Sequence, residues 1–260
     1  MFERFPTLLW AQKEKLIYFR YPKLFLNRDL VHGVFTRHGG FSDPPYRSLN
    51  TSYSVGDGRK NVAQNLAKIK KALGARRLIF MRQSHGDHIL LIREGHYIPC
   101  GEIPAADAII TDIAGLASLV KQADCQGVII FDPEKRVLAN VHCGWRGHVQ
   151  NILKKTVIRM KGAFGCNEFD LMAAIGPSLG PCCAEFVSHE EIFPETFNSF
   201  MVRQNYFDLW SIGRWQLESA GLRKENIEIA GVCTRCSTDL FYSYRGEGLT
   251  GRFGTVAMLR

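Results

Sequence analysis

Three short segments of the sequence each carry a side chain that commonly binds metal ions. His85 lies in the segment QSHG, Cys125 in ADC and His142 in VHCGWRG. Each segment adjoins a short apolar run and contains small or turn-forming residues, which places each side chain near the end of a predicted strand. The separations of 40 and 17 residues are too long for a zinc finger. They suit an enzyme site assembled from several strand ends.

Two histidines and one cysteine, with a fourth coordination position left open, are typical of catalytic zinc. Zinc lowers the pKa of bound water from about 15.7 to about 7, which makes hydroxide available at neutral pH. A chain with eight histidines and eight cysteines contains many such triples. The residue types alone therefore leave a second interpretation open, in which the cysteine is structural and the histidines are satisfied in the core.

The composition is that of a globular protein. Of the 260 residues, 46% are hydrophobic and 22% are charged, which excludes a disordered, collagen-like or coiled-coil chain. No apolar run approaches the roughly 20 residues that a membrane-spanning helix needs. Glu3 and Arg4 interrupt the first apolar residues, so no signal peptide is expected. We therefore expect a cytoplasmic protein with reduced thiols and no membrane partner.

The formal net charge of +8 is compatible with several kinds of anionic partner. The basic residues are scattered, with modest clusters only at 68–71 and 76–77. A basic tail or a stripe of alternating basic and aromatic residues is missing from the sequence, so a solvated basic face is the simplest explanation. We expect no nucleic-acid partner, and a nucleic-acid binder is the weakest of the alternatives.

Hydrophobic periodicity predicts the elements of an α/β (α+β) protein. A helix is expected from Asn61 to Leu73, because apolar residues recur on one face and Gly74 follows the last of them. Further helices are expected at 147–161 and 212–220, and strands at 31–37, 78–81, 88–92, 107–111, 116–120, 128–131, 137–141, 171–175, 227–232 and 240–242. Residues 1–30 are interpreted as a lead-in segment. The predicted architecture is a single domain, 1–260, with mixed β-sheets layered with flanking helices.

Ten motifs, in order along residues 31–260, carry a resemblance to a known family. They are RHGGFS (37–42), SLN (48–50), QSHG (83–86), ADA (106–108), ADC (123–125), VHCGWRG (141–147), IGPSLG (175–180), CTRC (233–236), FYSYR (241–245) and TGR (250–252). The chain resembles the YfiH family, also called laccase-domain or polyphenol oxidase proteins and, more recently, purine nucleoside phosphorylases. The combination of HCGWRG, ADC and QSHG is highly specific.

The resemblance implies layered sheets and helices, similar in architecture to the catalytic domain of the cytotoxic necrotizing factor toxins. It implies a zinc ion held by His85, Cys125 and His142. The implied activities are phosphorolysis of adenosine, inosine, guanosine or 5′-methylthioadenosine, and hydrolytic deamination of adenosine. The older family label implies copper and phenol oxidation, and a bacterial branch is assigned a role in editing peptidoglycan precursors.

The residues themselves separate some of these activities. Multicopper oxidation requires closely spaced histidine pairs, and the sequence contains no His-X-His. Copper chemistry is therefore the least expected. Deamination requires a carboxylate to move a proton, and Asp124 and Asp107 are the candidates. Because adjacent side chains of an extended segment point oppositely, Asp124 could instead support the neighbouring Cys125.

Phosphorolysis requires a site for the phosphate anion. Arg37, in a glycine-rich turn, and Arg146, where a helix opens, are the best candidates, with Arg245 a third. Each could instead form a structural ion pair. Asn50 could bond a ribose or base edge, although asparagine in such a loop is as often a turn former. The ring of Trp145 could stack on a purine or pack in the core.

Two other functions use the same residues. In the first, Cys125 is a catalytic nucleophile activated by His142, and the protein is an amide hydrolase that needs no zinc. In the second, zinc is structural and the protein is an assembly or editing factor that binds cell-wall precursors. The expected partner is a small-molecule substrate, a purine nucleoside with phosphate, and the oligomeric state is left open.

The remaining cysteines carry weaker signals. Cys233 and Cys236 form a C-x-x-C, but no second C-x-x-C is present to complete four ligands, so a structural or incidental role is expected. Cys182 and Cys183 follow a Gly-Pro turn and are candidates for a pocket wall.

Overall fold

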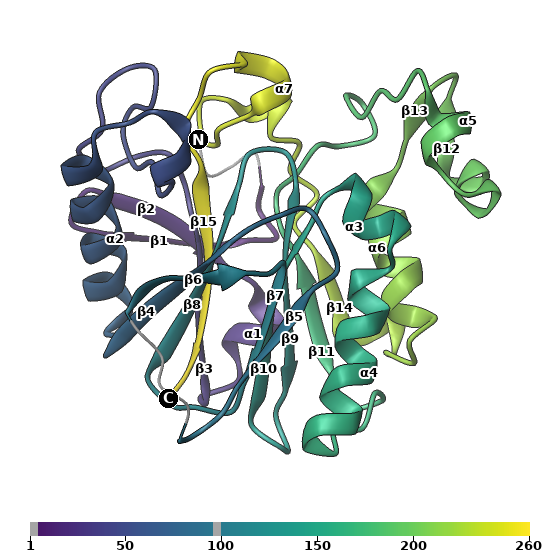
Figure 1. Ribbon diagram of the computed structural model, residues 1–260, viewed down its shortest axis with the longest axis horizontal. Coiled ribbons are helices and arrows are strands. Elements are labelled where there is room, and N and C mark those ends of the chain that lie inside the picture. Colours follow the sequence, from purple (N-terminus) through teal and green to yellow (C-terminus); the bar gives the residue numbers. More distant parts are fainter. Residues whose placement is uncertain (1–4, 96–99) are drawn as a thin grey trace.

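Two β-sheets pack face to face at the centre of the protein, and helices cover the outer face of each sheet (Figure 1). The structure is a computed structural model that describes residues 5–95 and 100–260. A mixed α/β architecture with flanking helices is therefore confirmed. The first four residues of the predicted lead-in segment lie outside the described residues.

The sheets combine parallel and antiparallel pairs. Over the described residues, the first sheet has the order β1 (Leu9–Lys13), β2 (Leu16–Arg20), β3 (Leu30–Phe35), β15 (Phe253–Leu259), β8 (Leu116–Gln122), β4 (Arg77–Arg82) and β6 (Gly101–Ala105). The second has the order β14 (Ile227–Ile229), β11 (Met172–Ile175), β9 (Gln126–Asp132), β10 (Val137–Cys143), β7 (Ala108–Thr111) and β5 (Ile89–Ile92). β4 is parallel to both of its neighbours, and the edge pairs β5–β7 and β11–β14 are also parallel.

Strand β9 illustrates why the central strands are continuously apolar. Ile129 and Phe131 pack between the two sheets, whereas Val128 and Ile130 pack under the helices. Successive side chains of a strand point to opposite faces, and here both faces are buried. Short apolar runs therefore indicate the central strands of this chain.

Helix α2 (Arg59–Leu73) covers the outer face of the first sheet and begins two residues before the predicted helix. It ends at Gly74, whose φ of 68° is left-handed, as the sequence predicts. Helices α3 (Trp145–Val149), α4 (Ile152–Phe164) and α6 (Leu209–Glu218) lie on the other side (Figure 1). Within the described ranges, no helix combines the length and apolar character needed to cross a bilayer.

The shorter elements lie mainly in the connections. They are α1 (Pro22–Phe25), α5 (His189–Ile192), α7 (Tyr244–Glu247), the 3₁₀ helices η2 (Tyr53–Val55), η3 (Glu195–Phe200), η4 (Lys224–Asn226) and η5 (Arg235–Ser237), and the β12 (Met201–Arg203) and β13 (Tyr206–Phe207) ribbon. Helix α5 and the ribbon form a lobe beside the main body (Figure 1). Their apolar side chains form a hydrophobic cluster that extends to α6.

The helix predicted at 147–161 is wrong as a single element. The chain forms α3 and α4 instead, separated by Asn151, which has a left-handed φ of 57°. Asparagine is among the few residues that adopt this conformation readily, and the conformation cannot continue a right-handed helix. Hydrophobic periodicity does not detect such a break.

Two further predictions are corrected. Residues 240–242 form a turn rather than a strand, because the N–H groups of Leu240 and Phe241 both donate to the carbonyl of Ser237, at 2.9 Å. Their apolar side chains are fully buried, so the apolar run indicated burial and not extension. Residues 9–30 are more than a lead-in segment, since they contribute β1, β2 and α1. Strands β6 and β15 were not predicted, although β15 lies at the centre of the first sheet.

Asn65 of α2 fastens the glycine-rich loop that follows β3. Its side-chain oxygen accepts a hydrogen bond from the N–H of Phe41 at 2.8 Å. Its amide group donates to the Ser42 hydroxyl and to the carbonyls of Ser48 and Asn50, at 2.8 to 3.2 Å. Because Asn65 is fully buried, removing it leaves several polar groups without a partner and without water.

We therefore predict that Asn65→Ala lowers the free energy of unfolding by about 2–4 kcal/mol, because buried groups lose their hydrogen bonds. Urea denaturation measures the change. The control is Gln64→Ala, one residue earlier on the exposed face of α2, which is expected to change stability by less than about 0.5 kcal/mol. Equal losses in the two variants would contradict the role given to Asn65.

Candidate functional site

The three segments that carry candidate ligands follow the ends of neighbouring strands. His85 follows β4, Cys125 lies in the turn between β8 and β9, and His142 is near the end of β10. Strands β9 and β10 are antiparallel, with His142 opposite Gly127, so the turn that carries Cys125 is next to His142. Strand β4 is parallel to β8, which brings the end of β4 to the same place.

The ligand atoms of His85, Cys125 and His142 all lie within 4.8 Å of one another. The two imidazole rings are nearly perpendicular, at 84°, with their centroids 4.8 Å apart. Two imidazole nitrogens and one thiolate sulfur are a donor set that suits zinc, and also copper. The residues present therefore fit a single metal ion with three protein ligands.

Asp107 orients this cluster from behind. Its carboxylate is fully buried and accepts a hydrogen bond from Nδ1–H of His142 at 2.8 Å. It also accepts the backbone N–H groups of Ser84, His85 and Gly86 and the Ser84 hydroxyl, at 2.8 to 3.2 Å. A carboxylate on Nδ1 fixes the histidine tautomer and leaves Nε2 available to a metal. Asp107 has no exposed surface, which favours a positioning role over proton transfer to substrate.

The electrostatics of the site favour the charged forms of Asp107, Cys125 and His142. Burial alone would raise the pKa of Asp107, but hydrogen bonds from His142 and Gly86 hold it well below its usual range. Burial would also raise the pKa of Cys125, but the positive charge of His142 and hydrogen bonds to both histidines lower it to about 6. Burial would lower the pKa of His142, whereas the Cys125 thiolate and Asp107 raise it to about 9. A thiolate is the form of cysteine that binds metals and attacks electrophiles.

Hydrogen bonds hold the Asp124 carboxylate to two neighbouring loops. Its Oδ1 accepts hydrogen bonds from the hydroxyls of Thr234 and Ser243, at 2.7 and 2.6 Å. Its Oδ2 accepts the backbone N–H of Arg245 at 2.6 Å. The carboxylate thus binds the loops at η5 and α7 to the turn that carries Cys125. This geometry favours the supporting role over the catalytic one.

His85 and Asp124 both have left-handed backbone conformations, with φ of 59° and 89°. Such conformations cost about 1 kcal/mol or more for residues other than glycine, and they persist where surrounding contacts hold them. Here the contacts are the hydrogen bonds to Asp107 and those of the Asp124 carboxylate. The two turns are therefore held in place before any ligand arrives.

Gly144 leaves the space that the Cys125 sulfur occupies. A Cβ atom at position 144 would lie 2.9 Å from Sγ of Cys125 and 3.6 Å from Cδ2 of His85. Its φ of −87° is allowed for any residue. The requirement for glycine therefore comes from the close approach of the ligands and not from the backbone.

A cavity of about 810 Å³ opens beside the three candidate ligands. The basic residues among its described lining are Arg59, Arg82, Lys121, Arg146, Arg245 and Arg252. They outnumber the acidic lining residues in that part of the chain, Glu102 and Asp124. A concave surface with this charge attracts anions. Trp145, Phe186 and Tyr244 add aromatic surface to the wall.

Two of the predicted substrate-binding residues lie elsewhere. Arg37 donates hydrogen bonds to Glu247 and to the carbonyl of Thr238, at 2.8 and 2.7 Å, and packs over the Tyr242 ring. Asn50 is fully buried and bonds Asp57 and the backbone at Ser52 and Arg252. Neither is among the described residues that line the cavity. Both geometries match the structural alternatives left open by the sequence.

Arg146 and Arg245 do line the cavity, as does Trp145. The guanidinium of Arg146 lies 4.2 Å from the centre of the Trp145 ring, and that of Arg245 donates to the carbonyl of Glu185 at 2.9 Å. Arg252 belongs to the motif TGR, to which the sequence alone assigns no role. Its guanidinium donates to the carbonyls of Thr250 and Gly251, which orients it at the cavity wall.

Fold and site together define an α/β protein with a candidate metal centre at the wall of a cationic cavity. The chain belongs to the family described as "Multi-copper polyphenol oxidoreductase laccase", whose model matches residues 31–260. The resemblance to the YfiH family is thereby confirmed.

Similar proteins agree with this membership. A purine nucleoside phosphorylase of Bacteroides thetaiotaomicron is 31% identical over 259 residues, covering 92% of this chain and 95% of that protein. Purine nucleoside phosphorylase YlmD of Bacillus subtilis is 29% identical and covers 87% of each chain. The crystal structure of the hypothetical protein YfiH of Bacillus licheniformis superposes with a TM-score of 0.85 at 26% identity, over 96% of this chain and 99% of that one.

We predict that Gly144→Ala lowers metal affinity at the candidate centre by about 10- to 100-fold, because the new methyl group displaces the Cys125 sulfur. Metal titration of the purified variant measures the change, and circular dichroism checks that the fold is kept. The matched control is Gly162→Ala in α4, where a Cβ atom meets nothing within 4 Å. Unchanged metal affinity in Gly144→Ala would contradict the arrangement described here.

Proposed function

We propose that this protein is a zinc-dependent purine nucleoside phosphorylase, acting on adenosine, inosine, guanosine or 5′-methylthioadenosine. The observation that carries the proposal is the meeting of His85, Cys125 and His142 beside a cationic cavity with aromatic walls. The names of the relatives support the same reaction. Phosphorolysis cleaves the bond between base and ribose with phosphate, and releases the free base and ribose 1-phosphate.

His85, Cys125 and His142 would hold the metal ion, and Asp107 would keep Nδ1 of His142 protonated so that Nε2 faces the ion. When bound, zinc would supply a Lewis acid that polarises an oxygen atom of the substrates. Copper is the alternative suggested by the family description. The pattern of two imidazoles and one thiolate is that of a single-ion site rather than of a multicopper cluster.

Arg146 and Arg245 would bind phosphate, because their guanidinium groups lie at the cavity wall and offer paired donors. Arg252, seven residues after Arg245, adds a third positive charge. The ring of Trp145 offers a flat apolar surface for the purine. The approach of a dianionic phosphate to the Cys125 thiolate is unfavourable unless cations offset it, and these arginines would do so.

Adenosine deamination is the second proposed activity of the same centre. Both carboxylates that the sequence indicates are already engaged in hydrogen bonds. Asp107 bonds His142, and Asp124 bonds Thr234 and the backbone of Arg245. Neither carboxylate is therefore available to transfer a proton to or from the substrate. We therefore expect deamination to be slower than phosphorolysis.

The deciding experiment incubates purified, metal-quantified protein with adenosine, with and without phosphate, and identifies the products by chromatography. Adenine that appears only with phosphate is the expected result. Inosine would demonstrate deamination, and hypoxanthine would require both reactions. Cys125→Ala is expected to lower turnover about 100-fold or more and to lose the metal ion held with His85 and His142, whereas the exposed Cys100→Ala keeps both the turnover and that ion. Absence of every product in metal-loaded protein would refute the proposal.

A further prediction concerns the phosphate site. Arg146→Ala is expected to raise the KM for phosphate about 10- to 100-fold, because one charge-assisted hydrogen bond to phosphate is lost. The KM for nucleoside is expected to change less. The control is Arg159→Ala on the exposed face of α4, which removes the same charge away from the cavity. Steady-state kinetics at varied phosphate separates the two constants. Equal effects of the two substitutions would rule out a local role for Arg146.

A cysteine-dependent amide hydrolase is the second candidate. It is favoured by the alignment of Cys125, His142 and Asp107, with the pKa of Cys125 lowered to about 6. The two candidates differ in their response to a chelator. If the protein is a phosphorylase, removal of zinc abolishes its activity. If it is a hydrolase, removal of zinc frees the Cys125 thiolate to act as nucleophile, and the activity is preserved or raised.

A further inference from the structure

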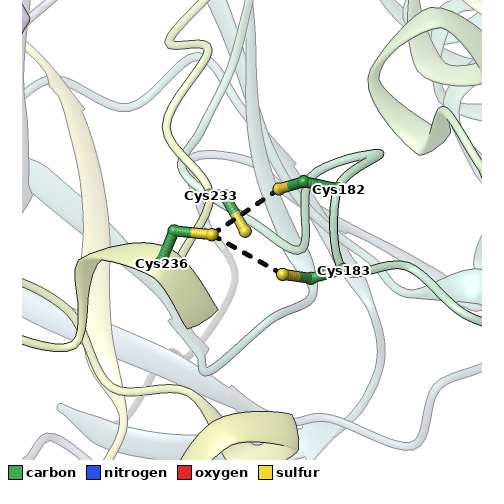
Figure 2. Close-up of side chains that lie close together, drawn as sticks. All are labelled: Cys182, Cys183, Cys233 and Cys236. Carbon is green, nitrogen blue, oxygen red and sulfur yellow. Dashed lines mark hydrogen bonds between the residues drawn. The ribbon is translucent and has the colours of Figure 1, made fainter.

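Four cysteines from two separate loops meet outside the site described above. Cys182 and Cys183 lie in the turn after Gly180, between β11 and α5. Cys233 precedes η5 and Cys236 lies within it. All four sulfur atoms lie within 4.8 Å of one another, and the four side chains converge on a common centre (Figure 2).

The spacing of the sulfurs is that of ligands around one ion. Sγ of Cys236 lies 3.6 Å from Sγ of Cys182 and 3.6 Å from Sγ of Cys183 (Figure 2). Tetrahedral zinc with Zn–S bonds of about 2.3 Å places its sulfur ligands about 3.8 Å apart. None of these four described cysteines forms a disulfide. A set of four thiolates around one centre is typical of a closed structural zinc site.

The backbone around the cluster is held in place by its own hydrogen bonds. Ser178 pairs with Cys233 in a parallel bridge, with hydrogen bonds from the Ser178 N–H to Val232 and from the Thr234 N–H to Ser178. The N–H of Gly180 donates to Sγ of Cys233 at 3.4 Å, a contact that stabilises a thiolate. The two loops are therefore in register before a metal binds.

Gly180 also provides the space that this packing needs. A Cβ atom there would lie 3.0 Å from Cβ of Cys233 and 2.9 Å from the Trp210 ring. Arg203 donates to the carbonyl of Cys182 at 3.2 Å, which brings a positive charge to a loop rich in thiolates. The glycine allows the two loops to approach closely, and the arginine suits a site that gathers negative charge.

The cluster is connected to the cavity through the same loops. Thr234, between Cys233 and Cys236, donates its hydroxyl to Asp124 at 2.7 Å. Leu179 donates its N–H to the carbonyl of Asp124 at 2.8 Å, and its side chain lines the cavity. Phe186, three residues after Cys183, lines the cavity as well. An ion among the four sulfurs would therefore fasten one wall of the cavity to the turn that carries Cys125.

We propose that Cys182, Cys183, Cys233 and Cys236 form a second metal site, which takes one Zn²⁺ ion through four thiolates and has a structural role. It shares no ligand with the cluster of His85, Cys125 and His142. Binding replaces the thiol protons of the four cysteines by one dication, and the protons pass to solvent. The site stands whether or not the protein is a phosphorylase.

The test counts metal ions and records their spectrum. Protein expressed with zinc and dialysed is expected to hold two zinc ions per chain by mass spectrometry of the elements. Cys125→Ala, which removes a ligand of the first site only, is expected to hold one. Replacement of that ion by Co²⁺ is expected to give the intense thiolate-to-metal absorption and visible bands of a tetrahedral four-sulfur site. The exposed Cys100→Ala is the control and keeps two ions.

The double variant Cys182→Ser, Cys236→Ser is expected to lose one ion and to unfold at lower temperature, while the Co²⁺ spectrum of its remaining site shows a single thiolate. Failure of that variant to fold does not affect the test, because the Cys125→Ala protein keeps all four cysteines. Cys125→Ala protein that binds no metal, or that binds Co²⁺ without the four-sulfur spectrum, would overturn the proposal. So would freshly purified wild-type protein in which these cysteines are disulfide-bonded and metal-free. None of these readouts depends on nucleoside turnover.

Discussion

The buried carboxylate of Asp107 is the interaction on which the site depends. It accepts five hydrogen bonds, four from the segment that follows β4 and one from His142 at the end of β10. β4 belongs to the first sheet and β10 to the second, so this single group ties the two sheets together at the candidate metal centre. A fully buried charge is costly unless it is surrounded by donors. The donors are here the backbone of one ligand segment and the side chain of a second ligand, so the requirement to satisfy Asp107 also positions His85 and His142.

Asp124 positions the turn that carries Cys125, as Asp107 positions His85 and His142. Its carboxylate draws the loops around Thr234 and Arg245 onto the turn that carries Cys125. These loops supply Tyr244 and Arg245 to the cavity wall, and Cys233 and Cys236 to the cysteine cluster. The two aspartates thus act in the same way, and the left-handed conformations of His85 and Asp124 mark the places where tertiary contacts oppose local preference.

The family description and the names of the relatives point to different chemistry, and the donor atoms help to separate them. The family is described by multicopper oxidation, whereas the relatives are named for the cleavage of purine nucleosides. One cluster in the described chain combines two imidazoles with a sulfur, and the other contains only sulfurs. Neither resembles a set of paired histidines around several coppers. The excess of guanidinium groups in the cavity fits a reaction with phosphate better than the oxidation of a neutral phenol.

Local residue patterns determined much of this protein. Apolar runs identified most central strands because those strands are buried on both faces. Three motifs identified His85, Cys125 and His142, whose ligand atoms the fold brings within 4.8 Å of one another.

Tertiary structure alone decided which polar side chains form structural hydrogen bonds and are therefore not available to a ligand. Arg37 and Asn50 occupy motifs as prominent as that of Arg146, yet partners such as Glu247 and the backbone of Arg252 lie more than 200 residues away in the sequence. The same holds for the cysteines. A lone C-x-x-C has no partner in the sequence pattern, but the pairing of β11 with β14 brings the loops that follow these strands together, and with them two cysteines from more than 50 residues away. Contacts between distant segments depend on strand order and register, which residue spacing does not encode.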